Sequence, residues 1–494
     1  MNSDVFPPST RLGMARLTVL LVVLALLVPS GVSALTHDPV ELQRGTIDEP
    51  ADGTTVIAVQ GFKLAGQNNS KKPARLVGVG PEGDLEWVHE AGDGIAWFYD
   101  VDPLEDGTLL VAGSHPSGAV VFKYDPATNE RVWTERLGTN DTHDADIINE
   151  HELLVADMRA YNESTGENDA GLFVYNRTSE EVVYRWHARS VYNRSQGGPY
   201  EGDWSHINDV DKVDDGEYML SVRNMDEVVL VNRSTDSVDW RLGADENLSV
   251  LYEQHNPQYI EREDGTPTVV VADSENDRVV EYEMVDRGDG DGSTTWNRTW
   301  TLGANGSLNW PRDADRLPNG NTLVTDSLNH RVLEVTPEGQ VVWEYYAPWG
   351  TYEAERVEVG DEPGGPTVRD QGGAGAYGLN GSAALTPGAT DRATFGEWVA
   401  STFAGTPLSG PVGWFGARWS HAVPWIRPVW MRPWAFVSAL GATLVAVGWT
   451  TADAIYHRRQ VRARLGALGG RLRRRLTGSP GTTTEATDSE ETTD

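Results

Sequence analysis

The chain has 494 residues, a formal net charge of −34 and no cysteine. The lack of cysteine excludes disulfides and thiolate chemistry, and an acidic chain without a basic patch in its folded region argues against a nucleic-acid partner. Its 18 tryptophans and 16 tyrosines argue against an acidic disordered chain, and only five of its 40 basic residues are lysine. An acidic, arginine-rich composition predicts a halophilic protein, solvated at molar salt.

The first apolar segment, Leu17–Val28, extends to about Leu35 and follows Arg11 and Arg16. It ends in small residues that resemble a cleavage site. We therefore predict that residues 1–35 are either a cleaved signal peptide or a retained transmembrane anchor.

A unit of about fifty residues repeats between residues 50 and 350. Each copy has short β-rich segments separated by turn glycines and ends in a strand that contains tryptophan. The six tryptophans are Trp87, Trp133, Trp186, Trp240, Trp300 and Trp343. This pattern predicts an all-β fold, a six-bladed β-propeller.

An acidic residue stands seven positions before the turn residue in most copies, and Gln258 replaces it in one. The acidic residues are Asp100, Asp144, Asp209 and Asp313. Three histidines, His143, His206 and His255, stand near the start of the innermost strand in successive copies. Because equivalent positions in radially arranged blades lie at equal distances from the axis, we expect the histidines to converge on the central channel. Arg223 is expected beside them, at a position where other copies have aspartate.

The region after the repeats divides into four segments by composition. Residues 351–395 are predicted to be a Gly/Pro-rich linker, and 396–433 a Trp-rich segment at a membrane interface. Residues 434–453 are long and apolar enough for a transmembrane helix. Residues 454–494 are predicted to be a basic and then disordered cytoplasmic tail.

The arginines near both apolar segments predict the membrane topology. They place both chain ends in the cytoplasm by the positive-inside rule, and the propeller on the extracellular face of the cell membrane. Ten N-x-S/T sequons, from Asn68 to Asn380, all lie between the two apolar segments. Their confinement predicts a translocated glycoprotein.

Three uses of the histidines and Arg223 remain open at this point. Three imidazoles can bind zinc or copper, but a neighbouring arginine disfavours a cation, and we expect no metal. The histidines could simply form hydrogen bonds between loops. The third use is an anion site, in which arginine grips sulfate or phosphate oxygens and histidine acts as an acid, base or nucleophile.

The motifs around these residues resemble the arylsulfate sulfotransferase family over roughly residues 80–347. They are Thr142-His143-Asp144, Asp203-Trp204-Ser205-His206-Ile207-Asn208-Asp209-Val210, Ser221-Val222-Arg223, Trp240-Arg241-Leu242-Gly243 and Gln254-His255-Asn256. The resemblance implies a six-bladed propeller that transfers a sulfuryl group from an aryl sulfate to a phenolic or other hydroxyl acceptor, such as a glycan. It implies no cofactor and no need for the nucleotide donor PAPS.

The resemblance also implies residue roles. His255 matches the nucleophile that becomes transiently sulfated, whereas His143, His206 and Arg223 match residues that bind sulfate oxygens and assist proton transfer. Asn208, Asn256 and Trp310 are expected to bind substrate. Asn224 departs from the pattern, because many relatives have histidine there, and the C-terminal anchor departs from the soluble periplasmic enzymes of the family.

Two points are left open by the sequence. The principal alternative to an enzyme is a non-catalytic cell-surface propeller that binds glycans or proteins. Self-association into a homo-oligomer is neither indicated nor excluded.

Overall fold

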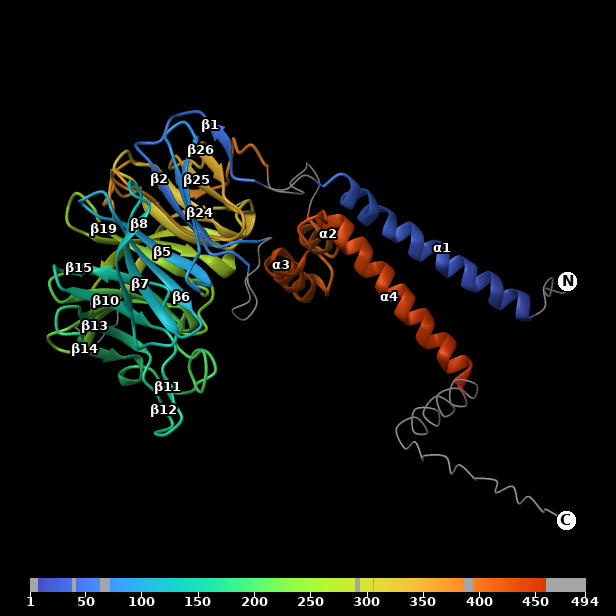
Figure 1. Cartoon of the computed structure of the whole chain (residues 1–494), viewed down its shortest axis with the longest axis horizontal. Coiled ribbons are helices and arrows are strands. Elements are labelled where there is room, and N and C mark those ends of the chain that lie inside the picture. The colour runs from blue at the N-terminus through green and yellow to red at the C-terminus, as the bar shows by residue number, and fades with distance from the viewer. Residues whose placement is uncertain are drawn as a thin grey trace, which may run out of the picture. The chain divides into compact units, whose positions relative to one another are not determined.

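The computed structural model describes residues 8–37, 41–62, 72–288, 294–304, 306–385 and 394–458. The chain divides into two units. One contains Asp38–Val429, and the other contains Met1–His37 together with Trp430–Asp494. The larger unit is a six-bladed β-propeller, as the sequence predicts, with one four-stranded antiparallel sheet at the centre of each blade (Figure 1).

Five blades follow one another in the chain, each with its first strand nearest the central channel. Their strands are β5 (Trp97–Pro103), β6 (Leu109–His115), β7 (Gly118–Asp125), β8 (Glu130–Arg136); β9 (Ala145–Ile147), β10 (Glu152–Asp157), β13 (Gly171–Asn176), β14 (Glu181–His187); β15 (Ile207–Asp214), β16 (Glu217–Val222), β17 (Glu227–Asn232), β18 (Ser237–Gly243); β19 (His255–Glu261), β20 (Pro267–Asp273), β21 (Arg278–Asp286), β22 (Thr295–Leu302); and β23 (Pro311–Arg316), β24 (Thr322–Asp326), β25 (Arg331–Val335), β26 (Val341–Tyr346).

The sixth blade joins the two ends of the propeller sequence. Its inner strand is β27 (Thr351–Arg356), which pairs with β2 (Thr55–Val59), followed by β3 (Arg75–Val79) and β4 (Leu85–Glu90). The propeller therefore extends beyond residue 350, where the sequence predicts its end. Strand β27 lies in the segment 351–395, which composition indicates as a linker. Its burial along the whole strand explains why it belongs to the fold.

Smaller elements decorate this frame. Strand β1 (Gln43–Ile47) extends the fifth blade beside β26, β28 (Gly375–Tyr377) pairs in parallel with β22, and β11 (Tyr161–Asn162) pairs with β12 (Glu167–Asn168). Short 3₁₀ turns follow the second strand of three blades: η2 (Arg223–Met225), η3 (Ser274–Asn276) and η4 (Ser327–Asn329). A fourth, η1 (Ala188–Ser190), follows β14.

Six of the hydrophobic clusters among the described residues lie one between each pair of neighbouring blades, and a seventh contains Phe62, Leu328 and Trp349. All six repeat tryptophans lie in the fourth strand of their blades, counted from the channel. Four of them, Trp186, Trp240, Trp300 and Trp343, are at most 2% exposed. The tryptophan therefore fills the same inter-blade space in successive repeats, which is why its spacing reports the number of blades.

Four helices lie outside the blades. Helices α2 (Phe395–Thr402) and α3 (Ser409–Ile426) belong to the propeller unit, and α1 (Pro8–Leu35) and α4 (Pro433–Tyr456) form the second unit. Segments Leu12–Leu35 and Pro433–Tyr456 are long and apolar enough to cross a membrane.

Polar contacts at both ends show that helices α1 and α4 run antiparallel. Ser33 Oγ donates to the Trp430 carbonyl at 2.8 Å, and Arg16 pairs with Asp453 at 2.8 Å. The basic and Thr/Glu-rich tail from residue 459, and the sequon asparagines Asn68 and Asn305, lie outside the described residues.

Candidate functional site at the channel mouth

The three predicted histidines converge at one end of the central channel. His143 lies just before β9, His206 just before β15, and His255 is the first residue of β19. The ring centroids of His143 and His206 are 5.2 Å apart, and Tyr352 of β27 lies between His143 and His255, 5.4 and 6.1 Å from their rings. All three imidazoles are at least nine-tenths buried.

The hydrogen bonds of His255 assign its tautomer. The Ser274 hydroxyl lies 2.8 Å from His255 Nδ1 and 3.3 Å from the Ala272 carbonyl. When the hydroxyl donates to that carbonyl, it accepts from Nδ1, and Nε2 then keeps its lone pair. The unprotonated Nε2 is the form of histidine that can attack an electrophile.

His206 is oriented by a charged network. Its Nδ1 donates to Asp203 at 2.8 Å, and Arg159 Nε donates to the same carboxylate at 3.2 Å. Burial opposes the ionisation of Asp203, but its bonds to His206 and Arg159 lower its pKa below the ordinary value. Asp203 is therefore a carboxylate that fixes the His206 ring and leaves its Nε2 free.

His143 is held by two tyrosines from other blades. The Tyr99 ring stacks on it at 3.9 Å between centroids, and the Tyr352 hydroxyl lies 2.9 Å from Nδ1. Both tyrosines are almost completely buried. Their contacts leave the ring little rotational freedom, which suits a group that must meet a substrate in one orientation.

Two arginines lie at the same mouth. Arg223, in η2, pairs with Glu253 and donates to Asn224 Oδ1 at 2.9 Å. Arg312, in β23, is only 5% exposed; its guanidinium lies over the rings of Trp310 and Tyr352 at 4.5 and 4.7 Å. Its Nη1 donates to Gln60 Oε1 at 2.7 Å.

The structure corrects the repeat position of Arg223. Strand pairing aligns Val222, not Arg223, with Asp273 and Asp326, because Val222 pairs with Glu227 as these aspartates pair with Arg278 and Arg331. Arg223 therefore corresponds to Ser274, the residue that bonds His255. The arginine replaces a site-facing serine rather than an aspartate.

Burial lowers the pKa of all three imidazoles below the ordinary value of 6.5. The pKa of His206 falls to about 4, because burial and Arg223 outweigh its hydrogen bond to Asp203. For His255, burial acts together with repulsion from Arg312 and Arg223. The histidines are therefore neutral at neutral pH, and the arginines alone supply positive charge.

The residues predicted to bind substrate occupy different surroundings. Asn208 is fully buried, and its Nδ2 donates to the Gln254 carbonyl at 3.0 Å, directly before His255. Asn256 turns toward the channel, where its Nδ2 donates to Glu353 at 3.3 Å. Trp310 faces the mouth, edge-on to His255 at 6.0 Å.

Helix α3 covers this part of the propeller. His421 stacks on Trp310 at 6.2 Å and bonds Asp277 at 2.9 Å, Arg418 pairs with Glu275, and Trp425 stacks on Phe62 at 4.1 Å. The predicted Trp-rich interfacial segment thus has one face against the propeller. Trp414 of the same helix is 65% exposed, so the propeller does not cover this part of the helix.

Sequence reasoning missed Arg312, Tyr99 and Tyr352. Each stands directly before the channel-facing acid of its inner strand, as His143 stands before Asp144. That shared offset was the available signal. Asp203 and Arg159 come from loops and have no repeat signal, whereas Ser274 recurs as Ser327 in the next blade.

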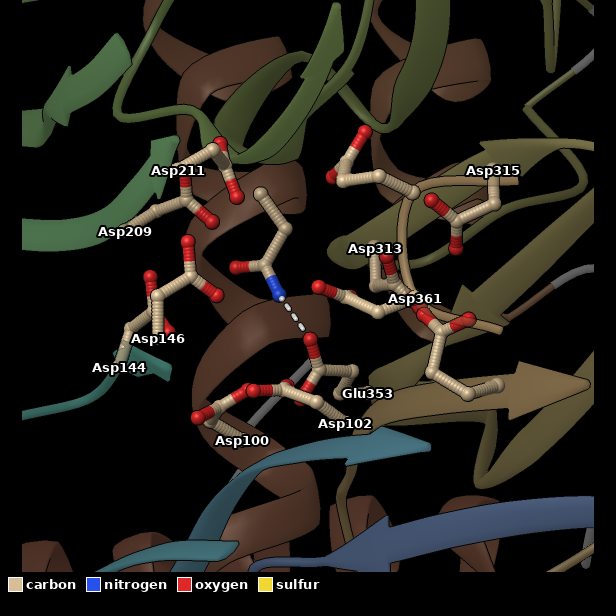
Figure 2. Close-up of a pocket in the computed structure, with 13 residues that line it drawn as sticks. Asp100, Asp102, Asp144, Asp146, Asp209, Asp211, Asp313, Asp315, Glu353 and Asp361 are labelled. Atoms are coloured by element: carbon tan, nitrogen blue, oxygen red, sulfur yellow. Dashed lines mark hydrogen bonds between the residues drawn. The ribbon is translucent and has the colours of Figure 1, made fainter. Parts of the chain in front are cut away.

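Carboxylates line the channel one residue further along the inner strands (Figure 2). Among the described residues, the side-chain groups close enough to share a metal ion consist only of these carboxylates. They include none of the three histidines, so the geometry gives no support to a three-histidine metal centre.

A second space lies beside the mouth. An open cavity of ≈ 480 Å³ is lined by Arg159, Tyr161, Arg185 and His187, among others. Since Arg159 also bonds Asp203, the cavity adjoins the network that holds His206.

Comparison with known proteins identifies one matching family. The arylsulfotransferase (ASST) family model matches residues 194–347, a range that includes His206, Arg223, His255 and Arg312. This match supports the arylsulfotransferase family and a sulfotransferase-type enzyme. No curated protein matches the chain.

Solved structures with a similar fold share little sequence with this chain. A protein of unknown function from Bacteroides caccae is 14% identical over 59% of this chain and 93% of its own, with a TM-score of 0.38. An inactive virginiamycin B lyase from Staphylococcus aureus, with quinupristin, is 9% identical over 62% and 88%, with a TM-score of 0.35. A nidogen/laminin complex chain is 10% identical over 61% and 97%, with a TM-score of 0.39.

Proposed function

We propose that this protein transfers a sulfuryl group from an aryl sulfate to a phenolic or other hydroxyl acceptor, without PAPS, through a transient sulfohistidine at His255. The observation that carries the proposal is the combination at the channel mouth: His255, a buried imidazole whose pKa burial lowers, lies near Arg312 and Arg223. The family match over residues 194–347 supports the same chemistry.

In the first half-reaction, His255 Nε2 attacks sulfur, the N–S bond forms and the bond from sulfur to the aryl oxygen breaks. The aryl oxide leaves and takes up a proton from solvent. Arg223 and Arg312 stabilise the sulfuryl oxygens, because a guanidinium matches such oxygens in charge and geometry. Nδ1 keeps its proton, so the intermediate is a sulfoimidazolium, which is a good leaving group for the next step.

In the second half-reaction, the acceptor oxygen attacks sulfur, the N–S bond breaks and His255 regains its lone pair. The proton of the acceptor hydroxyl goes to the neutral imidazole of His206, which Asp203 holds in position. A base with a lowered pKa can accept this proton only transiently and passes it to solvent. The covalent intermediate predicts ping-pong kinetics.

The surroundings suggest where substrates bind. Trp310 borders His255 edge-on, and we assign the donor ring to the space beside it. The cavity beside Arg159 has a volume within the range of small-molecule sites, and we assign the acceptor to it.

The two apolar helices are compatible with membrane anchoring. Arginine placement and the confined sequons support an extracellular, glycosylated propeller in a halophilic cell. On this basis the enzyme acts at the outer face of the cell membrane.

The test compares wild type with His255→Ala and with the matched control His151→Ala, an exposed histidine outside the site. Each full chain is given 4-nitrophenyl sulfate and phenol at high salt, and nitrophenol and phenyl sulfate are measured. Wild type and the control should form both products, whereas His255→Ala should lose about 10³-fold or more of the rate. Aryl sulfate binding without turnover in wild type would support the binding propeller instead.

A further inference from the structure

A second constellation lies in the channel beyond the histidines. Five inner strands each contribute two carboxylates at positions i and i+2, which point to the same side of a strand. We call Asp100, Asp144, Asp209, Asp313 and Glu353 the upper ring, and Asp102, Asp146, Asp211, Asp315 and Glu355 the lower ring. Together with Asp361, Glu362 and Asn256 they line one enclosed space, toward which the labelled carboxylates converge in Figure 2.

The upper ring has a structural role. Four of its members accept a backbone N–H from the inner strand of the next blade, and Gln258 does the same in the blade that lacks an acid. The bonds are Asp100 to Ala145 N, Asp144 to Val210 N, Gln258 to Arg316 N, Asp313 to Ala354 N and Glu353 to Val101 N. These bonds join successive blades around the axis, which explains the repeated acid in the sequence.

In the lower ring only Asp146 has such a bond among the described residues, from Lys212 N at 3.0 Å. Among the described residues, no backbone N–H bonds Asp102, Asp315 or Glu355, although each is at most 5% exposed. The Oδ2 atoms of Asp315 and Asp209, both 95% buried residues, accept no hydrogen bond from an N–H or O–H of the described residues. Buried acceptors are almost always satisfied, so these oxygens need either a proton shared with a neighbouring carboxyl group or a cation.

The size and charge of the space restrict that partner. Its volume is ≈ 10 Å³, about the room of one water-sized sphere. The described lining holds twelve carboxyl side chains and one amide, with no lysine, arginine or histidine. An organic ligand is too large for it, so protons or a small cation must neutralise these buried acids.

We propose that the channel binds one Ca²⁺-class divalent cation through Asp313, Asp315 and Glu355. Ligand oxygens of these three side chains lie within 4.8 Å of one another, and all three residues are buried. An all-oxygen, carboxylate-rich set suits a hard cation, and the uneven lining suits Ca²⁺ better than Mg²⁺, which demands near-ideal octahedral geometry. The site goes beyond the proposed transfer reaction and does not depend on it.

The cation would also support the mouth. Asp313 follows Arg312, and Glu353 follows Tyr352 and bonds Asn256, the residue after His255. An ion held by Asp313, Asp315 and Glu355 therefore joins β23, which carries Arg312, to β27, which carries Tyr352.

The experiment uses three full-length chains: wild type, Asp315→Asn with Glu355→Gln, and the charge-matched control Asp48→Asn with Glu49→Gln. Asp48 and Glu49 are exposed and lie outside the channel. Each protein is stripped with a chelator in KCl solution and titrated with Ca²⁺, with Mg²⁺ as a parallel arm. Bound metal is measured by equilibrium dialysis with elemental analysis, and stability by thermal unfolding.

We expect wild type and the control to bind about one Ca²⁺ per chain and to unfold at a higher temperature with it. The double channel variant should bind Ca²⁺ about 100-fold more weakly or not at all. Without metal it should unfold at a higher temperature than stripped wild type, because two buried like charges are gone. This opposite response distinguishes loss of the site from loss of the fold.

The proposal is overturned if stripped wild type binds no divalent cation in dialysis, a measurement that needs no variant. It is equally overturned if the channel variant binds Ca²⁺ as tightly as wild type. The sulfotransfer assay on the same samples is read separately, since an inactive chain that binds Ca²⁺ would contradict only the proposed function.

Discussion

The mouth of the channel and the channel below it are built from the same inner strands but differ in their side chains. The mouth carries His143, Arg312 and Tyr352, and the next residue of each strand is the acid Asp144, Asp313 or Glu353. A shift of one residue thus changes the lining from imidazole, guanidinium and phenol to carboxylate.

Burial disfavours charge in both layers, with opposite consequences. It lowers the pKa of the mouth histidines, which become neutral and able to act as nucleophiles or bases. Burial raises the pKa of channel acids such as Asp315 and Glu355, and repulsion between these acids raises the pKa values further. A neutral imidazole is useful as it stands, whereas a carboxylate cluster needs protons or a metal ion.

The largest effect on activity is expected from a substitution of Arg312, which changes the mouth and leaves the channel acids unchanged. Arg312→Gln removes a buried cation from the mouth and leaves Asp313 in the channel. We expect kcat/KM for the aryl sulfate to fall about 10²- to 10³-fold, as when a preorganised charge donor is lost, with Ca²⁺ binding retained. The control is Arg233→Gln, whose guanidinium lies over Tyr184 away from the mouth. Equal activity of the two variants would remove Arg312 from the site.

The next effect concerns the docking of α3 on the mouth. Burial lowers the pKa of His421, but its bonds to Asp277 and Glu275 outweigh burial and raise it to about 9, from 6.5. A raised pKa means that this histidine stabilises the fold fully below about pH 6.5 and that the contribution is lost as the pH rises through about 9. We expect a loss on the order of 2 kcal/mol in wild type, measured by denaturant unfolding across this range.

His421→Gln should flatten that dependence, with Arg418 and the two acids unchanged. A variant with the same pH slope as wild type would show that another group causes it.

A smaller effect is expected from the phenol that joins the layers. Tyr352→Phe removes the hydroxyl beside His143 Nδ1 but keeps the ring and the neighbouring Glu353. The loss of one buried hydrogen bond predicts a decrease of about tenfold or less in kcat, with unchanged Ca²⁺ binding. Tyr259→Phe, whose hydroxyl bonds Glu261 on the surface, is the control. A change in metal affinity instead of kcat would mean that Tyr352 serves the channel.

The smallest expected effect is the change of kcat/KM with pH. Because the pKa of His255 lies well below 6.5, kcat/KM should vary by no more than about twofold as the pH falls from 7.5 to 6. Initial rates in one salt and a constant-ionic-strength buffer test this. Half-maximal activity near pH 6.5 would show an imidazole with an ordinary pKa in the rate-determining step.

The sequence predicted those parts of the molecule that repeat. The six tryptophans gave the blade number because each one fills the space between two blades, and the phase of the repeat brought the three histidines together. The closure by β27 escaped detection, because Thr351–Arg356 has no tryptophan strand after it and pairs with a strand some three hundred residues earlier.

The errors and omissions at the site also have physical causes. Arg223 was placed one position wrong because only strand pairing shows where β16 ends relative to β20 and β24. Arg312 and Tyr352 were missed because their blades place different residue types at the position of His143. The unsatisfied oxygens of the lower ring depend on burial and bond geometry, which no repeat pattern reports.

The central claim is that His255 of the mouth becomes covalently sulfated. Wild type and His255→Ala are mixed with 4-nitrophenyl sulfate without acceptor, quenched at alkaline pH, digested and analysed by mass spectrometry. The account predicts a peptide containing His255 that is heavier by one SO₃ group, which disappears when phenol is added before quenching. An unmodified His255 peptide in a sample that releases nitrophenol, or a sulfuryl group on another residue, would contradict it.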